Sequence, residues 1–104
     1  MRLPFAAELR ATEMNSGIEI WGETTNLSKG GCYVRTSQSF PQGTLLVIEI
    51  RSHRVRFVTD ARVAYALDSE GMGLSFLNIP AKQLPILEDW LSSAVVPVPP
   101  RITE

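Results

Sequence analysis

Hydrophobic and polar residues alternate through most of the first two-thirds of this 104-residue chain. Phe5, Ala7, Leu9 and Ala11 fall on one face of the first run, and polar residues share the opposite face with Ala6. Successive side chains of a strand point to opposite faces, so this period of two predicts β-structure. The pattern predicts six short strands, in the runs 5–12, 18–25, 32–35, 45–50, 57–65 and 71–76.

The same alternation predicts which side chains face the core. In the second run, Ile18 and Ile20 should point inward, opposite Glu19, Trp21 and Glu23. The fourth run is rich in branched aliphatic residues and should be largely buried. In the fifth run, five residues share the apolar face: Phe57, Thr59, Ala61, Val63 and Tyr65.

The period changes after Phe76, where leucines recur at helical spacing. Asn78 is a candidate cap and Pro80 suits a first turn, which predicts a helix near residues 80–93. Pro85 lacks an N–H, so the regular part should begin near it. Six strands followed by one helix predict a small antiparallel β-barrel whose opening the helix covers. We expect one domain over residues 2–93 and a disordered, Pro-rich tail over 94–104.

Composition excludes several classes of function. Ten basic residues against eleven acidic ones give a net charge near −1, so we expect no binding to nucleic acid. The chain shows no secretory leader and no apolar run long enough to span a bilayer, which favours a cytoplasmic protein without membrane insertion. A single cysteine, Cys32, excludes an internal disulfide.

The segment Asn26-Leu27-Ser28-Lys29-Gly30-Gly31 combines an amide, a hydroxyl and two glycines between two predicted strands. Asn and Ser side chains bond to nearby backbone groups, and glycine allows close approach of another group. On local chemistry the segment is either a simple chain reversal or a turn that holds a ligand against its backbone. Both interpretations stay open at this point.

Other candidate residues are weaker. Arg51, Arg54 and Arg56 crowd a predicted hairpin tip with His53, where they could hold phosphate, although a solvated tip is favoured because acidic residues lie nearby. His53 is expected at the surface and Cys32 in the core. No nucleophile with a base, acid–base pair or metal cluster is visible, so we expect no enzyme, no metal and no cofactor.

The motif Asn26-x-Ser28-x-x-Gly31, its continuation Gly-Cys-Tyr-Val-Arg-Thr and the late run Gly71 to Phe76 together resemble the PilZ domain. The resemblance covers roughly residues 2–92. It implies a six-stranded barrel that binds the bacterial second messenger cyclic di-GMP through an RxxxR motif and a D/NxSxxG motif. The second motif is complete here. Arg2 resembles the second arginine of RxxxR, and the sequence contains no complete RxxxR.

The resemblance places the ligand at five positions: Arg2, Asn26, Ser28, Gly30 and Gly31. Arginine can pair with phosphate or with guanine O6 and N7, and the Asn26 amide oxygen would accept from guanine N–H groups. Ser28 would contact phosphate or fix the turn, and the two glycines would offer backbone N–H groups to an anion. The alternative is a scaffold that binds a protein of motility or envelope assembly instead of the nucleotide.

Overall fold

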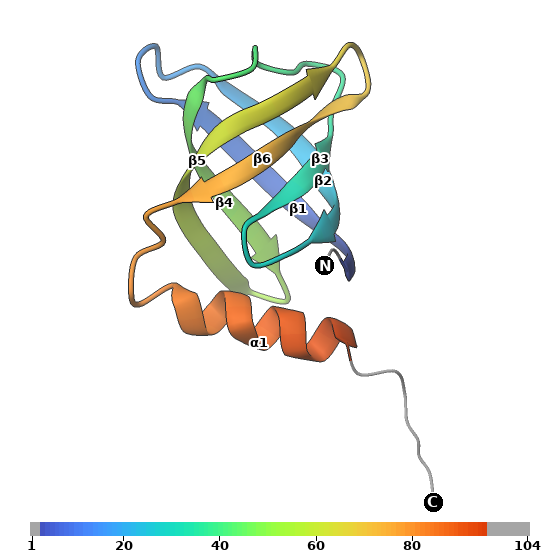
Figure 1. Cartoon of the computed structure of the whole chain (residues 1–104), viewed down its shortest axis with the longest axis vertical. Coiled ribbons are helices and arrows are strands. Elements are labelled where there is room, and N and C mark those ends of the chain that lie inside the picture. Colours follow the sequence, from blue (N-terminus) through green and yellow to red (C-terminus); the bar gives the residue numbers. More distant parts are fainter. Residues whose placement is uncertain (1–2, 96–104) are drawn as a thin grey trace, which may run out of the picture.

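The computed structural model describes residues 3–95, which form a closed antiparallel barrel with one helix (Figure 1). The strands close in the order β1-β2-β3-β6-β5-β4. Their bounds are β1 (Leu3–Glu13), β2 (Glu19–Leu27), β3 (Gly31–Arg35), β4 (Leu45–Ser52), β5 (Val55–Leu67) and β6 (Gly71–Leu77), and α1 spans Leu84–Val95. The predicted fold class is therefore confirmed, with all six strands in the predicted positions.

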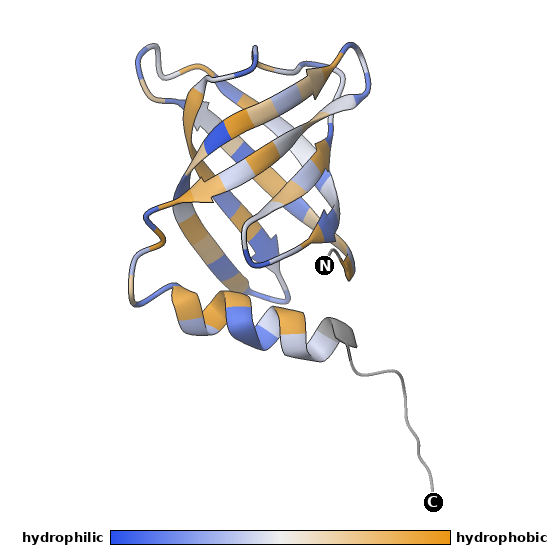
Figure 2. Cartoon of the chain, viewed as in Figure 1, coloured by the Kyte–Doolittle hydropathy of each residue, from blue (hydrophilic) through white to orange (hydrophobic). Residues whose placement is uncertain are grey.

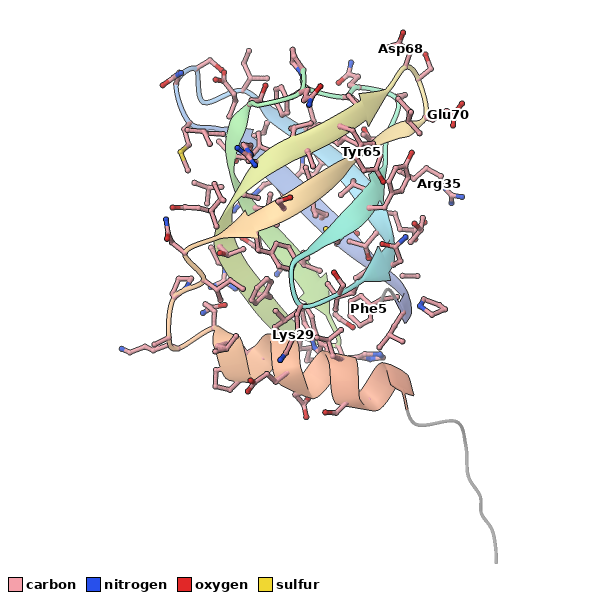
Figure 3. All side chains as sticks on the ribbon, in the orientation of Figure 1. Phe5, Lys29, Arg35, Tyr65, Asp68 and Glu70 are labelled. Carbon is pink, nitrogen blue, oxygen red and sulfur yellow. The ribbon has the colours of Figure 1, made fainter. Side chains whose placement is uncertain are left out.

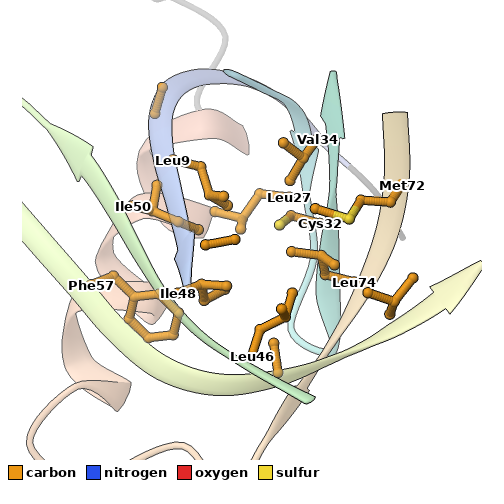
Figure 4. Packing of buried hydrophobic residues seen from close by; sticks show 14 of the residues in the cluster. Leu9, Leu27, Cys32, Val34, Leu46, Ile48, Ile50, Phe57, Met72 and Leu74 are labelled. Carbon is orange, nitrogen blue, oxygen red and sulfur yellow. The ribbon is translucent and has the colours of Figure 1, made fainter. Parts of the chain in front are cut away.

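The barrel interior is filled by the inward side chains of every strand (Figure 4). Leu9, Ile48 and Phe57 are fully buried or nearly so. Leu9 and Phe57 alternate with more exposed residues along their strands, whereas Ile48 is followed by the buried Glu49. Cys32 is also fully buried, as the sequence predicts. Burial of a side chain of this size contributes about 1.5 to 3 kcal/mol, which makes these alternating positions the main source of stability.

Helix α1 lies across one end of the barrel (Figure 1), and apolar residues recur along it (Figure 2). Leu87 and Trp90 are buried there, and the Trp90 ring centroid lies 5.1 Å from that of Phe5 and 6.1 Å from that of Phe57. The Val58 N–H donates to Gln83 Oε1 at 2.8 Å, which ties the start of the helix to β5. The helix therefore closes the opening, as predicted.

The regular part of the helix begins next to Pro85, as the sequence predicts, and residues 80–83 of the predicted range 80–93 precede it. Leu84 is the first helical residue, and Pro85 follows it, where a missing N–H costs no helical hydrogen bond. Residues 81–83 form a turn, in which the Gln83 N–H donates to the Pro80 carbonyl. Asn78 has a φ of 46° and lies six positions before the helix, so the predicted Asn78 cap is wrong. The helix extends to Val95, and residues 96–104 of the predicted tail lie outside the described residues.

Two predicted inward residues point to solvent. Ile18 precedes the first paired residue of β2 and is 57% exposed. Tyr65 is 39% exposed because the pairing of β5 with β6 shifts between Val63 and Tyr65, and this bulge reverses the alternation. The Tyr65 ring then covers Gly73 of β6, where an added Cβ would lie 2.3 Å from the ring. The glycine therefore makes room for the aromatic side chain.

Candidate functional site

The Asn26 to Gly31 segment spans the end of β2, the connecting residues 28–30 and the first residue of β3. Asn26 Oδ1 accepts a hydrogen bond from the Tyr33 N–H at 3.1 Å, across the two strands. Ser28 Oγ accepts from the Gly31 N–H and donates to the Gly31 carbonyl, both at 3.2 Å. The Ser28 N–H closes the turn on the same carbonyl at 2.8 Å. The motif therefore fixes its own backbone before any ligand is considered.

The two glycines of the motif have different surroundings. Gly31 is buried, and a Cβ at this position would lie 1.9 Å from the Leu74 carbonyl oxygen of β6. Gly30 is exposed, and a Cβ there would have no atom within 4 Å. The Gly31 N–H is directed to Ser28, so the exposed peptide at Gly30 is the better placed of the two for an external anion.

Lys29 is a cation that the sequence analysis did not single out, because it occupies a variable position of the motif. Its side chain is exposed at the turn, and Figure 3 shows it at the end of the barrel that the helix covers. An ammonium group on a fixed turn attracts phosphate as a point charge. Arg2 lies outside the described residues, and β1 pairs with β2 from Leu3, opposite Leu27.

A groove of about 460 Å³ lies between the start of β1, the β4–β5 hairpin and α1. Phe5 and Trp90 supply apolar surface, and His53 and Asp89 supply titratable groups. Pro4 also lines the groove and is the register partner of Asn26. The first residues of β1 therefore lie between this groove and the Asn26 to Gly31 turn.

Tyr33 lies on the outer surface next to the turn, as the register partner of Asn26. Its ring stacks on Tyr65, with centroids 6.2 Å apart and planes at 28°. Desolvation raises the pKa of the Tyr33 phenol above 10.0, and the charges of Glu70 and Tyr65 raise it further. The fold therefore favours the neutral phenol.

This shift predicts a pH dependence of stability. Because the folded pKa lies above 10.0, the contribution of Tyr33 is complete below pH 10.0 and is lost as the pH rises through the folded pKa. Tyr33→Phe should remove this part of the decline, which urea unfolding between about pH 9 and 11 would measure. Equal pH slopes for the variant and the wild type would contradict the assignment.

The other candidates lie where solvent reaches them. The β4–β5 connection is a two-residue turn in which His53 and Arg54 have φ values of 49° and 69°. His53, Arg51, Arg54 and Arg56 are all exposed, which confirms the predicted surface position of His53 and a solvated hairpin tip. Within residues 3–95, no three His, Cys, Asp or Glu side chains gather closely enough to hold a metal ion. No helix in the same range is long and apolar enough to cross a membrane.

These features define a class of small antiparallel barrels with a helix over one end and a self-bonded turn beside it. Solved structures share the fold. The PilZ domain of CeSA from a cellulose-synthesizing bacterium matches with a TM-score of 0.71 and 19% identity, over 89% of this chain and 96% of that one. The Escherichia coli YcgR PilZ domain, solved with cyclic di-GMP, matches with a TM-score of 0.71 and 16% identity, over 90% and 88%.

The Bacillus subtilis inhibitor of motility (MotI/DgrA) matches with a TM-score of 0.72 and 21% identity, over 88% of this chain but only 48% of that one. At these identities the matches establish the fold. A search of curated protein sequences found no match. The PilZ domain family model matches residues 1–93, and the chain belongs to the PilZ domain family.

Proposed function

We propose that this protein is a bacterial, cytoplasmic signalling module that binds cyclic di-GMP and acts without catalysis. The observation that supports the proposal is the complete Asn26-x-Ser28-x-x-Gly31 motif, folded as a rigid turn on a barrel like that of the YcgR domain solved with this nucleotide. A turn that is fixed in advance loses little conformational entropy when a ligand binds.

The nucleotide would lie against the turn and the start of β1. Leu3 pairs with Leu27 beside the turn, and the residue that precedes Leu3 in the sequence is Arg2. Its guanidinium can pair with a phosphate or with the O6 and N7 atoms of guanine. Lys29 adds a second positive charge, and the exposed peptide at Gly30 adds a neutral site for an anion.

Asn26 and Ser28 would act by holding this turn, which for Ser28 is one of the two roles expected from the sequence and for Asn26 differs from the expected direct contact with guanine. The Asn26 amide oxygen already accepts from the Tyr33 N–H, and both hydrogen-bonding functions of the Ser28 hydroxyl engage Gly31. Preorganised backbone and cationic groups would then make the direct contacts with the phosphates.

The second candidate function is a scaffold that binds a partner protein and leaves the nucleotide aside. The internal hydrogen bonds of the motif favour it, because a turn that satisfies its own polar groups needs no ligand to be stable.

Calorimetric titration of the 104-residue chain with cyclic di-GMP tests the proposal. With one of two expected arginines, we expect a Kd of about tens of micromolar or weaker, since one missing charged partner removes one to two decades of affinity. Lys29→Ala should weaken binding further, by about threefold to tenfold.

The matched control is Lys82→Ala, because Lys82 is also an exposed lysine but lies in the turn before α1. It should leave the affinity unchanged. If the folded chain shows no heat change at ligand concentrations of roughly 300 µM, the sensor proposal is wrong and the scaffold is the better account.

A further inference from the structure

Three arginines converge on one carboxylate on the outer surface of β1, β4 and β5. The Arg10 Nη2 atom lies 2.7 Å from Glu49 Oε1, and Arg56 Nη1 lies 3.7 Å from the same oxygen. Arg51 Nε lies 3.4 Å from Glu49 Oε2. The Glu49 side chain is only 10% exposed, so its two oxygens lie beneath the guanidinium groups.

The cluster keeps guanidinium donors that remain accessible to solvent. Besides Glu49, two acids lie beside the arginines in the described part of the chain: Glu19 approaches Arg10 at 3.9 Å, and Glu8 is the register partner of Arg51. The side chains of Arg51 and Arg56 are 56% and 60% exposed. Each guanidinium has five N–H donors, so most of these donors remain available to a partner. Glu49 holds the arginines in place without consuming their binding capacity.

An apolar anchor lies beside the cluster. Trp21 is 58% exposed, and its ring centroid lies 6.0 Å from Arg10 Cζ. The pairing registers place Trp21, Arg10 and Glu49 in one row across β2, β1 and β4. The neighbouring row continues through Arg51 of β4 to Arg56 of β5. Tryptophan and arginine are among the residue types most enriched at the energetic centres of protein interfaces.

We propose that this arginine–tryptophan face, made by Arg10, Arg51, Arg56 and Trp21, docks an acidic amphipathic helix of a partner protein. Paired strands lie about 5 Å apart, so Arg51 and Arg56 match two carboxylates one helical turn apart. An apolar residue about two turns further along such a helix would reach Trp21. This docking uses neither the Asn26 to Gly31 turn nor the nucleotide, so it goes beyond the proposed function.

The acidic border of the face selects a protein over a nucleic acid. Glu8, Glu19 and Glu23 occupy outward positions of β1 and β2 next to the cluster. A nucleic acid backbone carries negative charge along its whole length. Where it extended beyond the arginines, its phosphates would be repelled by these carboxylates. A helix with two carboxylates and an apolar side meets the arginines at one end and Trp21 at the other.

The experiment uses a synthetic amphipathic helical peptide that carries two glutamates one turn apart and leucine two turns further on. Titrated into the ¹⁵N-labelled chain, it should shift the amide resonances of β1 and β4 and the Trp21 indole N–H. Trp90 of α1 is buried against the barrel and serves as an internal reference. A peptide with lysine in place of glutamate should cause no such shifts.

The double variant Arg51→Glu/Arg56→Glu should weaken peptide binding by at least about tenfold. The matched control is Arg62→Glu, because Arg62 is exposed on β5 and makes no ion pair within residues 3–95. It should bind as the wild type does. If the charge reversal unfolds the chain, the double variant Arg51→Gln/Arg56→Gln is used instead. It should also weaken peptide binding.

Three outcomes would overturn the proposal. The first is that the double variant and the control bind the peptide equally well. The second is that the peptide shifts resonances on another face of the barrel. The third is that the chain associates with itself and the double variant abolishes this association, because a second copy would then be the occupant. Duplex DNA that shifts the same resonances at physiological salt would count against it too. None of these results bears on the calorimetry with cyclic di-GMP, so the two proposals fail separately.

Discussion

Gly31→Ala is expected to abolish the native barrel, whereas Gly30→Ala should leave it intact. The Cβ of residue 31 would lie 1.9 Å from the Leu74 carbonyl oxygen, and that oxygen belongs to the backbone of the paired strand β6. Relief would require β3 and β6 to separate where they are hydrogen-bonded. We expect a loss of more than about 4 kcal/mol, a large share of the 5 to 15 kcal/mol that stabilises a typical domain.

Gly30 is the control because it lies one residue away in the same turn. It is exposed, its φ is not positive, and an added Cβ would meet no atom within 4 Å. Its substitution should change the unfolding free energy by no more than about 0.5 kcal/mol in urea titration followed by circular dichroism. Comparable midpoints for both variants would show that β6 does not constrain residue 31.

This comparison also changes how the motif should be tested. Loss of nucleotide binding by a Gly31 variant would report the loss of the fold, because its backbone already lies against β6. Gly30→Ala and Lys29→Ala alter the exposed part of the turn and leave the core untouched. They therefore separate ligand contact from folding.

The sequence was sufficient for the fold because alternation is a local property. Side chains such as Leu9 and Ile48 point inward wherever the strand is regular, and each inward position can be read from its neighbours. Tyr65 could not be placed in this way. Its orientation depends on a bulge against β6, and the bulge is a property of the pair of strands and not of either one alone.

The candidate site was less accessible to sequence reasoning, because its contacts join distant residues. The hydrogen bond from the Tyr33 N–H to Asn26 follows from the register of β2 with β3, which the motif does not specify. Arg10 and Glu49 are separated by 39 positions and meet only when β1 pairs with β4. Residue types predicted a turn and a basic hairpin, and only the pairing of strands showed what their side chains touch.

The strongest effect on ligand binding is expected from a second arginine. An N-terminal extension that places an arginine four residues before Arg2 would complete RxxxR next to the start of β1. Two guanidiniums could then contact one ligand, and we expect cyclic di-GMP to bind about tenfold to a hundredfold more tightly than to the 104-residue chain. Calorimetry on both chains at one ionic strength measures the difference.

Two variants of the extended chain show whether the gain comes from paired guanidiniums or from added charge. Arg2→Ala should lose most of the gain, because a single guanidinium cannot recognise phosphate and guanine together. Lysine in place of the new arginine keeps the charge without the planar pair of donors and should recover only part of the affinity. If the extended chain binds no more tightly than the 104-residue chain, Arg2 is not half of a nucleotide site.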